Sequence, residues 1–282
     1  MSLDIGEALG EGLSRLSTRP GGALIVAFAA VGLLSAVLSR TLQVGALEAL
    51  LEAARAASPE QLGLTQAAYD EQTAALEAQL ETARASPLAL EAPLSVAAGG
   101  LVAVALVFEA ASIVAVRAFA ADDPATVGRE VVDGLGMATL NGFVGGVVVW
   151  VLVIAGSALF VPGLFAAVGF YFLRQEVALN DENALDALAA SWRLAKGNRV
   201  GVFTLALVVV VSQLNLVVGL AVETASPAAA AVASAVVGGV IAAFGAAAVT
   251  RGYLQLTDAD ESATEAASDP YDAALGPDDI PE

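Results

Sequence analysis

The 282-residue chain contains no cysteine and no histidine. The missing cysteine excludes disulfides, thiolate metal sites and cysteine nucleophiles. The missing histidine removes the commonest general base, the commonest metal ligand and the Ser-His-Asp triad. The sequence also has no G-x-x-x-x-G-K-S/T loop that would bind a phosphate. We therefore expect no catalytic residues, no cofactor and no metal site.

Positive charge is also scarce, since 12 Lys and Arg stand against 30 Asp and Glu and give a formal net charge of −18. Phosphate backbones are bound through basic patches, so we expect no nucleic-acid partner. Only one of the basic residues is a lysine. An acidic surface nearly free of lysine resembles proteins of salt-loving archaea, in which salt screens the self-repulsion. We expect a halophilic archaeon as the source; the alternative is an ordinary acidic tail, because nine of the acids lie between Asp258 and Glu282.

Apolar residues make up 57% of the chain, and its mean hydropathy is +0.75. Between Gly134 and Leu173 forty residues carry no charge, and only Pro162-Gly163 interrupts the run. Two helices of about 20 residues, each crossing a hydrocarbon core of about 30 Å, would use up this run. Similar runs predict an all-α polytopic membrane protein with six transmembrane helices, at 20–42, 93–117, 139–160, 163–180, 200–222 and 227–250. The fourth could instead be a re-entrant or tilted segment, because Arg174 and Glu176 lie near its end.

These spans define a six-helix transmembrane domain at residues 1–256 and a disordered acidic cytoplasmic tail at 257–282, which contains no basic residue. The orientation follows from the basic residues in short loops. With a cytoplasmic N-terminus, nine basic residues fall on or near the inner side: Arg15, Arg19, Arg117, Arg129, Arg174, Arg193, Lys196, Arg199 and Arg251. Only three, Arg40, Arg55 and Arg84, fall outside. We therefore expect a multi-pass protein of the cell membrane with both termini in the cytoplasm.

The connection between the first two spans, residues 43–92, carries apolar residues at helical spacing. Its first half repeats them at 3-4-3 spacing from Val44 to Ala54, and its second half at 4-3-4-3 spacing from Tyr69 to Ala83. We predict an extracellular helical hairpin here. Two interpretations stay open: a docking surface for a membrane or extracellular protein partner, or an acidic solvated cap that merely links two spans.

Short amphipathic stretches precede three of the predicted spans. Apolar residues share one helical face at 5–16 and at 185–192, and the stretch at 123–138 has a matching pattern. Such helices lie in the headgroup plane with the apolar face toward the lipid. We predict three interfacial helices in contact with membrane lipids, and Gly197-Asn198 as the end of the last one.

Residues 187–199 read ALAASWRLAKGNR. This segment resembles the pattern AL-x-x-SW-x-L-x-K/R-GN of the membrane domain that accompanies some bacterial glycerophosphodiester phosphodiesterases and of stand-alone multi-spanning proteins of haloarchaea. The Pro162-Gly163 turn before it is also similar. The resemblance covers about residues 1–255, with its signal between 160 and 200. It implies a membrane domain without phosphodiesterase activity, because that activity belongs to a separate soluble barrel that uses histidines.

Ionisable side chains at membrane depth are functional candidates, because burying one costs roughly 2.5–3.5 kcal/mol on insertion scales. Glu109 precedes Arg117 by eight residues and Arg174 precedes Asn180 by six, which corresponds to depths of about 12 Å and 9 Å at 1.5 Å per residue. We predict a contact between Glu109 and Arg174, direct or through water. Together with Glu176 they form a candidate intramembrane polar site for a proton, an ion or a lipid headgroup. Alternatively the pair only fixes helix register, while Arg174 and Glu176 reach to the interface.

The interfacial motif consists of Ser191, Trp192, Lys196, Gly197 and Asn198. Trp192 is most simply an interfacial anchor. Ser191 has no base within reach and is not expected to act as a nucleophile. The paired glycines at 99–100, 145–146 and 238–239 are expected at packing or kink positions.

The missing catalytic chemistry and the predicted hairpin favour a non-catalytic integral membrane protein that acts as a scaffold or binds a partner. The alternative is a transporter, channel or lipid-handling protein with a polar site near Glu109 and Arg174. A membrane-embedded enzyme is a third possibility, but it would need clustered carboxylates with a metal, and the predicted spans hold only Glu109 and Glu176.

Overall fold

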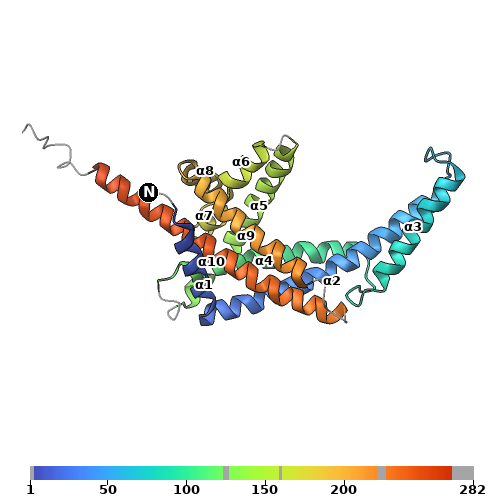
Figure 1. The fold of residues 1–282 in the computed structure, drawn as a ribbon, viewed down its shortest axis with the longest axis horizontal. Helices are drawn as coiled ribbons and strands as arrows, with labels where there is room; N and C mark the ends of the chain where they lie inside the picture. The colour runs from blue at the N-terminus through green and yellow to red at the C-terminus, as the bar shows by residue number, and fades with distance from the viewer. Residues whose placement is uncertain (1–2, 123–126, 159–160, 221–226, 269–282) are drawn as a thin grey trace, which may run out of the picture. The chain divides into compact units, whose positions relative to one another are not determined.

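The computed structural model describes residues 3–122, 127–158, 161–220 and 227–268. Within these ranges every regular element is helical and no strand occurs, which confirms the predicted all-α class. The elements (Figure 1) are α1 (Ile5–Leu16), α2 (Arg19–Ala56), α3 (Gln66–Arg84), α4 (Leu94–Ala120), the 3-10 helix η2 (Arg129–Val132), α5 (Leu135–Ser157), α6 (Val161–Gly169), α7 (Leu173–Leu179), α8 (Ala184–Lys196), α9 (Arg199–Leu220) and α10 (Pro227–Ser268).

Four of the described helices, α2, α4, α5 and α10, are long and apolar enough to cross a membrane. A fifth crossing results if α8 and α9, which are bent by 106° at a short break, are counted together. Large apolar side chains on these helices are exposed, such as Trp150 at 68% and Val102 at 55%. Such extensive apolar surface is typical of helices that face lipid, so the structure supports a membrane protein.

The helices form two compact units. The first lies within residues 1–23, 112–212 and 243–282, and the second within 24–111 and 213–242. Four helices, α2, α4, α9 and α10, contribute residues to both units.

The core of the first unit consists of two groups of buried apolar side chains. One group surrounds Phe172, which is wholly buried and packs edge to face against Tyr253 of α10 with ring centroids 5.7 Å apart. The other group surrounds Ile113 of α4 and Val177 of α7 and includes residues of α5 and α8. The short helix α7 is therefore part of the core of this unit.

Arg117, near the C-terminal end of α4, joins three segments of the first unit. Its Nε donates to the carbonyl oxygen of Ala178 at 2.7 Å, and its Nη1 donates to those of Val131 at 3.3 Å and Asp133 at 2.5 Å. Its Nη2 forms an ion pair with Asp181 at 2.8 Å, while the Arg117 side chain is only 11% exposed. Carbonyl oxygens thus satisfy most of the donors of a guanidinium that is largely withdrawn from water.

The second unit contains most of α2, all of α3, the first part of α4 and the first part of α10. The rings of Phe28 in α2 and Phe108 in α4 lie 5.4 Å apart. Glycine lets α10 approach α2 closely, because a Cβ at Gly239 would lie 2.5 Å from the carbonyl oxygen of Ile25. The neighbouring Gly238 has open space around the same position. Only one glycine of this pair is therefore required for helix packing.

The C-terminal half of α2 pairs with α3 in antiparallel fashion. The hydroxyl of Tyr69 donates to the carbonyl oxygen of Ala54 at 3.1 Å near one end, and Arg84 pairs with Glu48 at 2.6 Å near the other. Because α2 is one helix of 38 residues, the predicted first span and the first half of the 43–92 connection are continuous.

The structure corrects the prediction of one helix at residues 163–180. The chain forms α6 of 9 residues and α7 of 7 residues, separated at Phe170–Phe172. At 1.5 Å per residue these helices are about 14 Å and 10 Å long, so neither helix alone spans a hydrocarbon core of about 30 Å. The prediction of a continuous fourth helix is therefore wrong.

The third predicted interfacial stretch, 123–138, does not form a separate amphipathic α-helix. Residues 129–132 form η2, α5 begins at Leu135, and residues 123–126 lie outside the described residues. In η2 the carboxylate of Glu130 accepts a hydrogen bond from the backbone nitrogen of Gly128 at 2.8 Å. This hydrogen bond favours the charged form and lowers the pKa of Glu130.

The C-terminal boundary also differs from the prediction. We expected disorder from residue 257 onward, but α10 continues through Ser268, so residues 257–268 are helical. The remainder of the predicted tail, 269–282, lies outside the described residues.

Candidate functional site

A buried carboxylate lies among α7, α8 and α10 of the first unit. Glu176 is 4% exposed, and its Oε2 accepts a hydrogen bond from the side-chain nitrogen of Asn180 at 2.6 Å. The same nitrogen donates to the hydroxyl oxygen of Tyr253 at 3.0 Å. A carboxylate withdrawn from water is tolerated only when polar groups surround it, and these two side chains supply them.

An open polar pocket of about 610 Å³ adjoins this carboxylate. Its charged lining residues are Glu176, Glu182, Arg193 and Asp260, and Asn198 and Thr257 add neutral polar groups. The Oε2 atom of Glu182 is buried and has no hydrogen-bond partner among the described residues. An unsatisfied buried acceptor is unfavourable, so this pocket offers a place for a ligand that donates hydrogen bonds or carries positive charge.

The predicted polar site involves residues of both units. Glu109 is buried, at 7% exposed, and belongs to the second unit. Arg174 is partly buried and belongs to α7 in the first unit, together with Glu176. The contact between Glu109 and Arg174 therefore stays a prediction, whereas Glu176 forms part of a described pocket.

Ser191 of the motif satisfies the backbone at the break between α6 and α7. Its wholly buried hydroxyl accepts a hydrogen bond from the backbone nitrogen of Phe172 and donates one to the carbonyl oxygen of Gly169, both at 3.1 Å. These backbone groups would otherwise be unpaired inside the protein. The hydroxyl of Ser191 therefore uses both its donor and its acceptor capacity to stabilise this backbone break.

Trp192 packs at the same break. A Cβ at Gly169 would lie 2.3 Å from Cε3 of the Trp192 indole, and the ring of Phe170 lies 5.3 Å from it, centroid to centroid. Trp192, predicted as an interfacial anchor, thus packs against the end of α6, and its anchor role stays a prediction.

The remaining motif residues lie at the end of α8. Lys196 is the last residue of the helix and is exposed, and Gly197 is its C-cap, which confirms the predicted end. Gly197 and Asn198 line the pocket next to Glu176. The sequence did not reveal the roles of Asn180, Glu182 and Tyr253, because nothing in their local pattern indicates that α7 and α10 meet.

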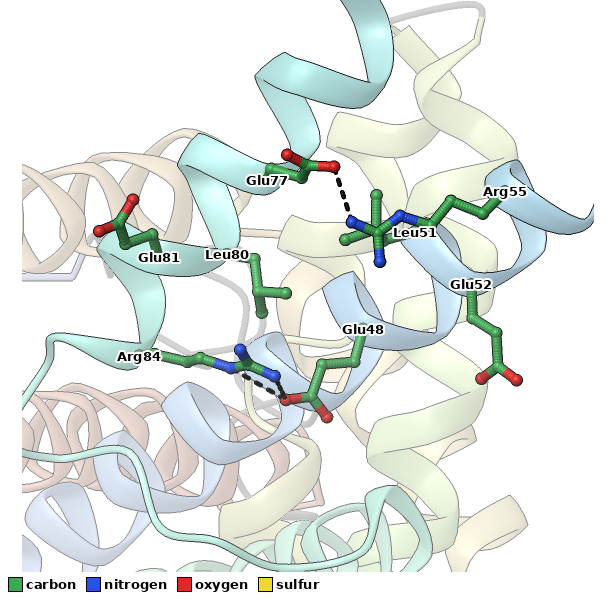
Figure 2. A pocket seen from close by; sticks show the side chains of 8 residues that line it. All are labelled: Glu48, Leu51, Glu52, Arg55, Glu77, Leu80, Glu81 and Arg84. Carbon is green, nitrogen blue, oxygen red and sulfur yellow. Dashed lines mark hydrogen bonds and ion pairs between the residues drawn. The ribbon is translucent and has the colours of Figure 1, made fainter. Parts of the chain in front are cut away.

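A second polar feature lies in the second unit, in the groove between α2 and α3 (Figure 2). The groove has a volume of about 650 Å³, and its lining residues are Glu48, Leu51, Glu52 and Arg55 of α2 and Glu77, Leu80, Glu81 and Arg84 of α3. Arg55 pairs with Glu77 at 2.7 Å, and Arg84 pairs with Glu48. Glu52 and Glu81 take part in neither ion pair (Figure 2). The groove therefore carries two carboxylates in excess over its arginines.

Among the described residues, no group of three or more His, Cys, Asp or Glu side chains could hold a metal ion. Residues 3–256 match a family described as a domain of unknown function (DUF7847). No curated protein and no solved structure matches the chain.

Proposed function

The chain belongs to this family of unknown function, and on that premise we propose that it is a non-catalytic integral membrane protein that binds a protein partner. The α2–α3 pair is the binding element, and in this proposal it stands on the extracellular side as the predicted hairpin. The partner presents a basic segment to the groove between the two helices.

The observation that carries this proposal is the charge of the groove. Residues 43–92 contain eight Asp and Glu but only two Arg, and both arginines are engaged in ion pairs within the groove. Glu52 and Glu81 remain as exposed carboxylates along its length. Complementary charge directs association and selects partners, so a basic segment fits this surface.

The test uses two double variants with the same change in net charge. Glu52→Gln with Glu81→Gln removes the unpaired groove carboxylates, and Glu60→Gln with Glu71→Gln removes two exposed carboxylates outside the groove. A partner is first crosslinked to the wild-type protein in intact cells, identified, purified and then titrated against each purified variant. We expect the groove variant to bind roughly tenfold more weakly and the control variant to bind like the wild type. Failure to crosslink any partner, or equal affinities for both variants, would contradict the proposal.

We further propose six crossings with both termini in the cytoplasm. The distribution of the basic residues supports this topology, because with a cytoplasmic N-terminus nine of the twelve would fall on the inner side. In it, α6 and α7 together return the chain to the inner side, where α8 lies along the membrane surface before α9 enters it. We also propose that residues 187–199 relate the chain to the membrane domain that accompanies some glycerophosphodiester phosphodiesterases.

The polar pocket of the first unit favours a second candidate function, the binding of a small cationic solute as in a transporter or lipid-handling protein. The buried Glu176 and the unsatisfied Oε2 of Glu182 support it. Thermal unfolding of the purified protein with added ammonium, potassium or small amines would test it. Stabilisation by one of these that Glu182→Gln abolishes and Asp186→Asn preserves would favour this function over partner binding alone.

A further inference from the structure

An apolar pocket lies between α6 and the start of α9, and none of its lining residues belongs to the polar pocket. Its volume is about 170 Å³, and its lining residues are Leu164, Phe165 and Val168 of α6 and Arg199, Val200 and Phe203 of α9. Phe165 is 46% exposed and Val200 is 80% exposed. The pocket is therefore an open apolar slot with one positive charge.

Arg199 is held in place by two aromatic rings. Its guanidinium carbon lies 5.2 Å from the ring centroid of Phe165 and 5.1 Å from that of Trp192. Cation–π contacts engage the faces of a guanidinium and leave its five N–H donors at the edge. Within the described part of the chain no residue accepts a hydrogen bond from Arg199 or forms an ion pair with it. The arginine is thus oriented, and its donors are available for an anion.

The backbone adds further donors at the corner between α8 and α9. The helices bend by 106° here, and the first hydrogen bond of the α9 ladder runs from the nitrogen of Val202 to the carbonyl oxygen of Asn198. The backbone N–H groups of residues 199–201 precede this bond and have no partner within the helix. They lie at the positive end of the α9 dipole, and the exposed Lys196 lies three residues earlier in the sequence, at the end of α8.

We propose that this corner binds an anionic phospholipid. The edge of Arg199 and the first amides of α9 bind the phosphate of the headgroup, and an acyl chain lies in the slot formed by Phe165, Val168 and Phe203. Charge complementarity selects this occupant, because a cationic group oriented by aromatic rings and bordering an apolar slot matches a phosphate attached to a hydrocarbon chain. This lipid site is distinct from the proposed partner-binding groove, because the slot and the α2–α3 groove share no residue.

The test measures lipid binding to the purified full-length protein by native mass spectrometry, with phosphatidylglycerol and phosphatidylcholine as probes. We expect the wild type to prefer phosphatidylglycerol and Arg199→Gln to bind it on the order of tenfold more weakly. Arg129→Gln, which removes an exposed arginine of η2 outside the slot, should behave like the wild type. No preference in the wild type, or an equal loss in both variants, would overturn the proposal.

A second variant keeps the test valid if Arg199→Gln does not fold. Val200→Glu places a carboxylate at a position that is 80% exposed, and Leu185→Glu makes the same change at a position on α8 that is 75% exposed. We expect only Val200→Glu to abolish the preference for phosphatidylglycerol. Competition by inorganic phosphate alone, at concentrations similar to those of the lipid, would show that the slot contributes nothing and would contradict the lipid assignment.

Discussion

The hydroxyl of Ser191 in α8 lies 3.1 Å from the backbone nitrogen of Phe172 and 3.1 Å from the carbonyl oxygen of Gly169. One side chain therefore replaces the helical hydrogen bonds that are lost where α6 ends and α7 begins. The adjacent Trp192 fills the space next to Gly169, where any side chain would collide with the indole. Ser191 and Trp192 thus both contact the backbone at the break between α6 and α7.

Ser191→Ala should destabilise the protein by about 1–3 kcal/mol, because it leaves a buried backbone N–H and a buried carbonyl without partners. The free energy of unfolding in mixed micelles is the measurement. Ser14→Ala is the matched control, since Ser14 is an exposed helical serine whose hydroxyl bonds only to its own helix. A loss for Ser191→Ala no larger than that for Ser14→Ala would show that the break is satisfied in another way.

Adjacent glycines of α10 should respond in opposite directions to the same substitution. Gly239→Ala forces a Cβ to within 2.5 Å of the Ile25 carbonyl oxygen, whereas Gly238→Ala meets nothing within 4 Å. We expect a loss of about 1–3 kcal/mol for Gly239→Ala from overpacking. Gly238→Ala should be neutral or gain up to about 1 kcal/mol, because alanine is the better helix former. Equal effects on the thermal midpoint would contradict the described packing of α2 and α10.

Arg117→Gln should destabilise the first unit much more than Asp181→Asn. The guanidinium donates to three carbonyl oxygens as well as to Asp181, and hydrogen bonds from a charged group contribute about 1.5–3 kcal/mol each at most. Asp181 is 77% exposed, so its ion pair should contribute less than about 1 kcal/mol. Chemical denaturation of both variants provides the comparison. A larger effect for Asp181→Asn would show that the ion pair, rather than the carbonyl contacts, holds these segments together.

The seam between α2 and α3 should depend on leucine more than on charge. Leu80 is 6% exposed, and Leu80→Ala should cost about 2–5 kcal/mol as a buried large-to-small change. Glu77 is half exposed in its pair with Arg55, so Glu77→Gln should cost less than about 1 kcal/mol. Limited proteolysis of residues 57–65, which connect the two helices, reports the opening of the pair. Faster cleavage in Glu77→Gln than in Leu80→Ala would show that the ion pair stabilises the α2–α3 pair more than the buried leucine does.

The helical class could be predicted because a long uncharged segment in lipid must satisfy its backbone hydrogen bonds within itself, as an α-helix does. The break at Phe170–Phe172 could not, since no proline marks it and its partner Ser191 lies 22 residues beyond Gly169. The burial of Glu109 follows from its position within an apolar run. The contacts of Arg117 could not be predicted, because they are made to backbone carbonyl oxygens, which every residue has and no sequence pattern marks. The motif at 187–199 contains the residues that contact the break between α6 and α7. Its physical meaning, including the position of Arg199 between two rings, required the neighbouring helix α6.

Cysteine labelling tests the proposed topology and the external groove most directly, because the chain contains no cysteine of its own. Glu71→Cys places a single thiol on α3, and Lys196→Cys places one at the end of α8; both positions are exposed. In intact cells a membrane-impermeant maleimide should label Glu71→Cys, and it should label Lys196→Cys only after the membrane is opened. Labelling of Lys196→Cys in intact cells, or of Glu71→Cys only after opening, would contradict the account.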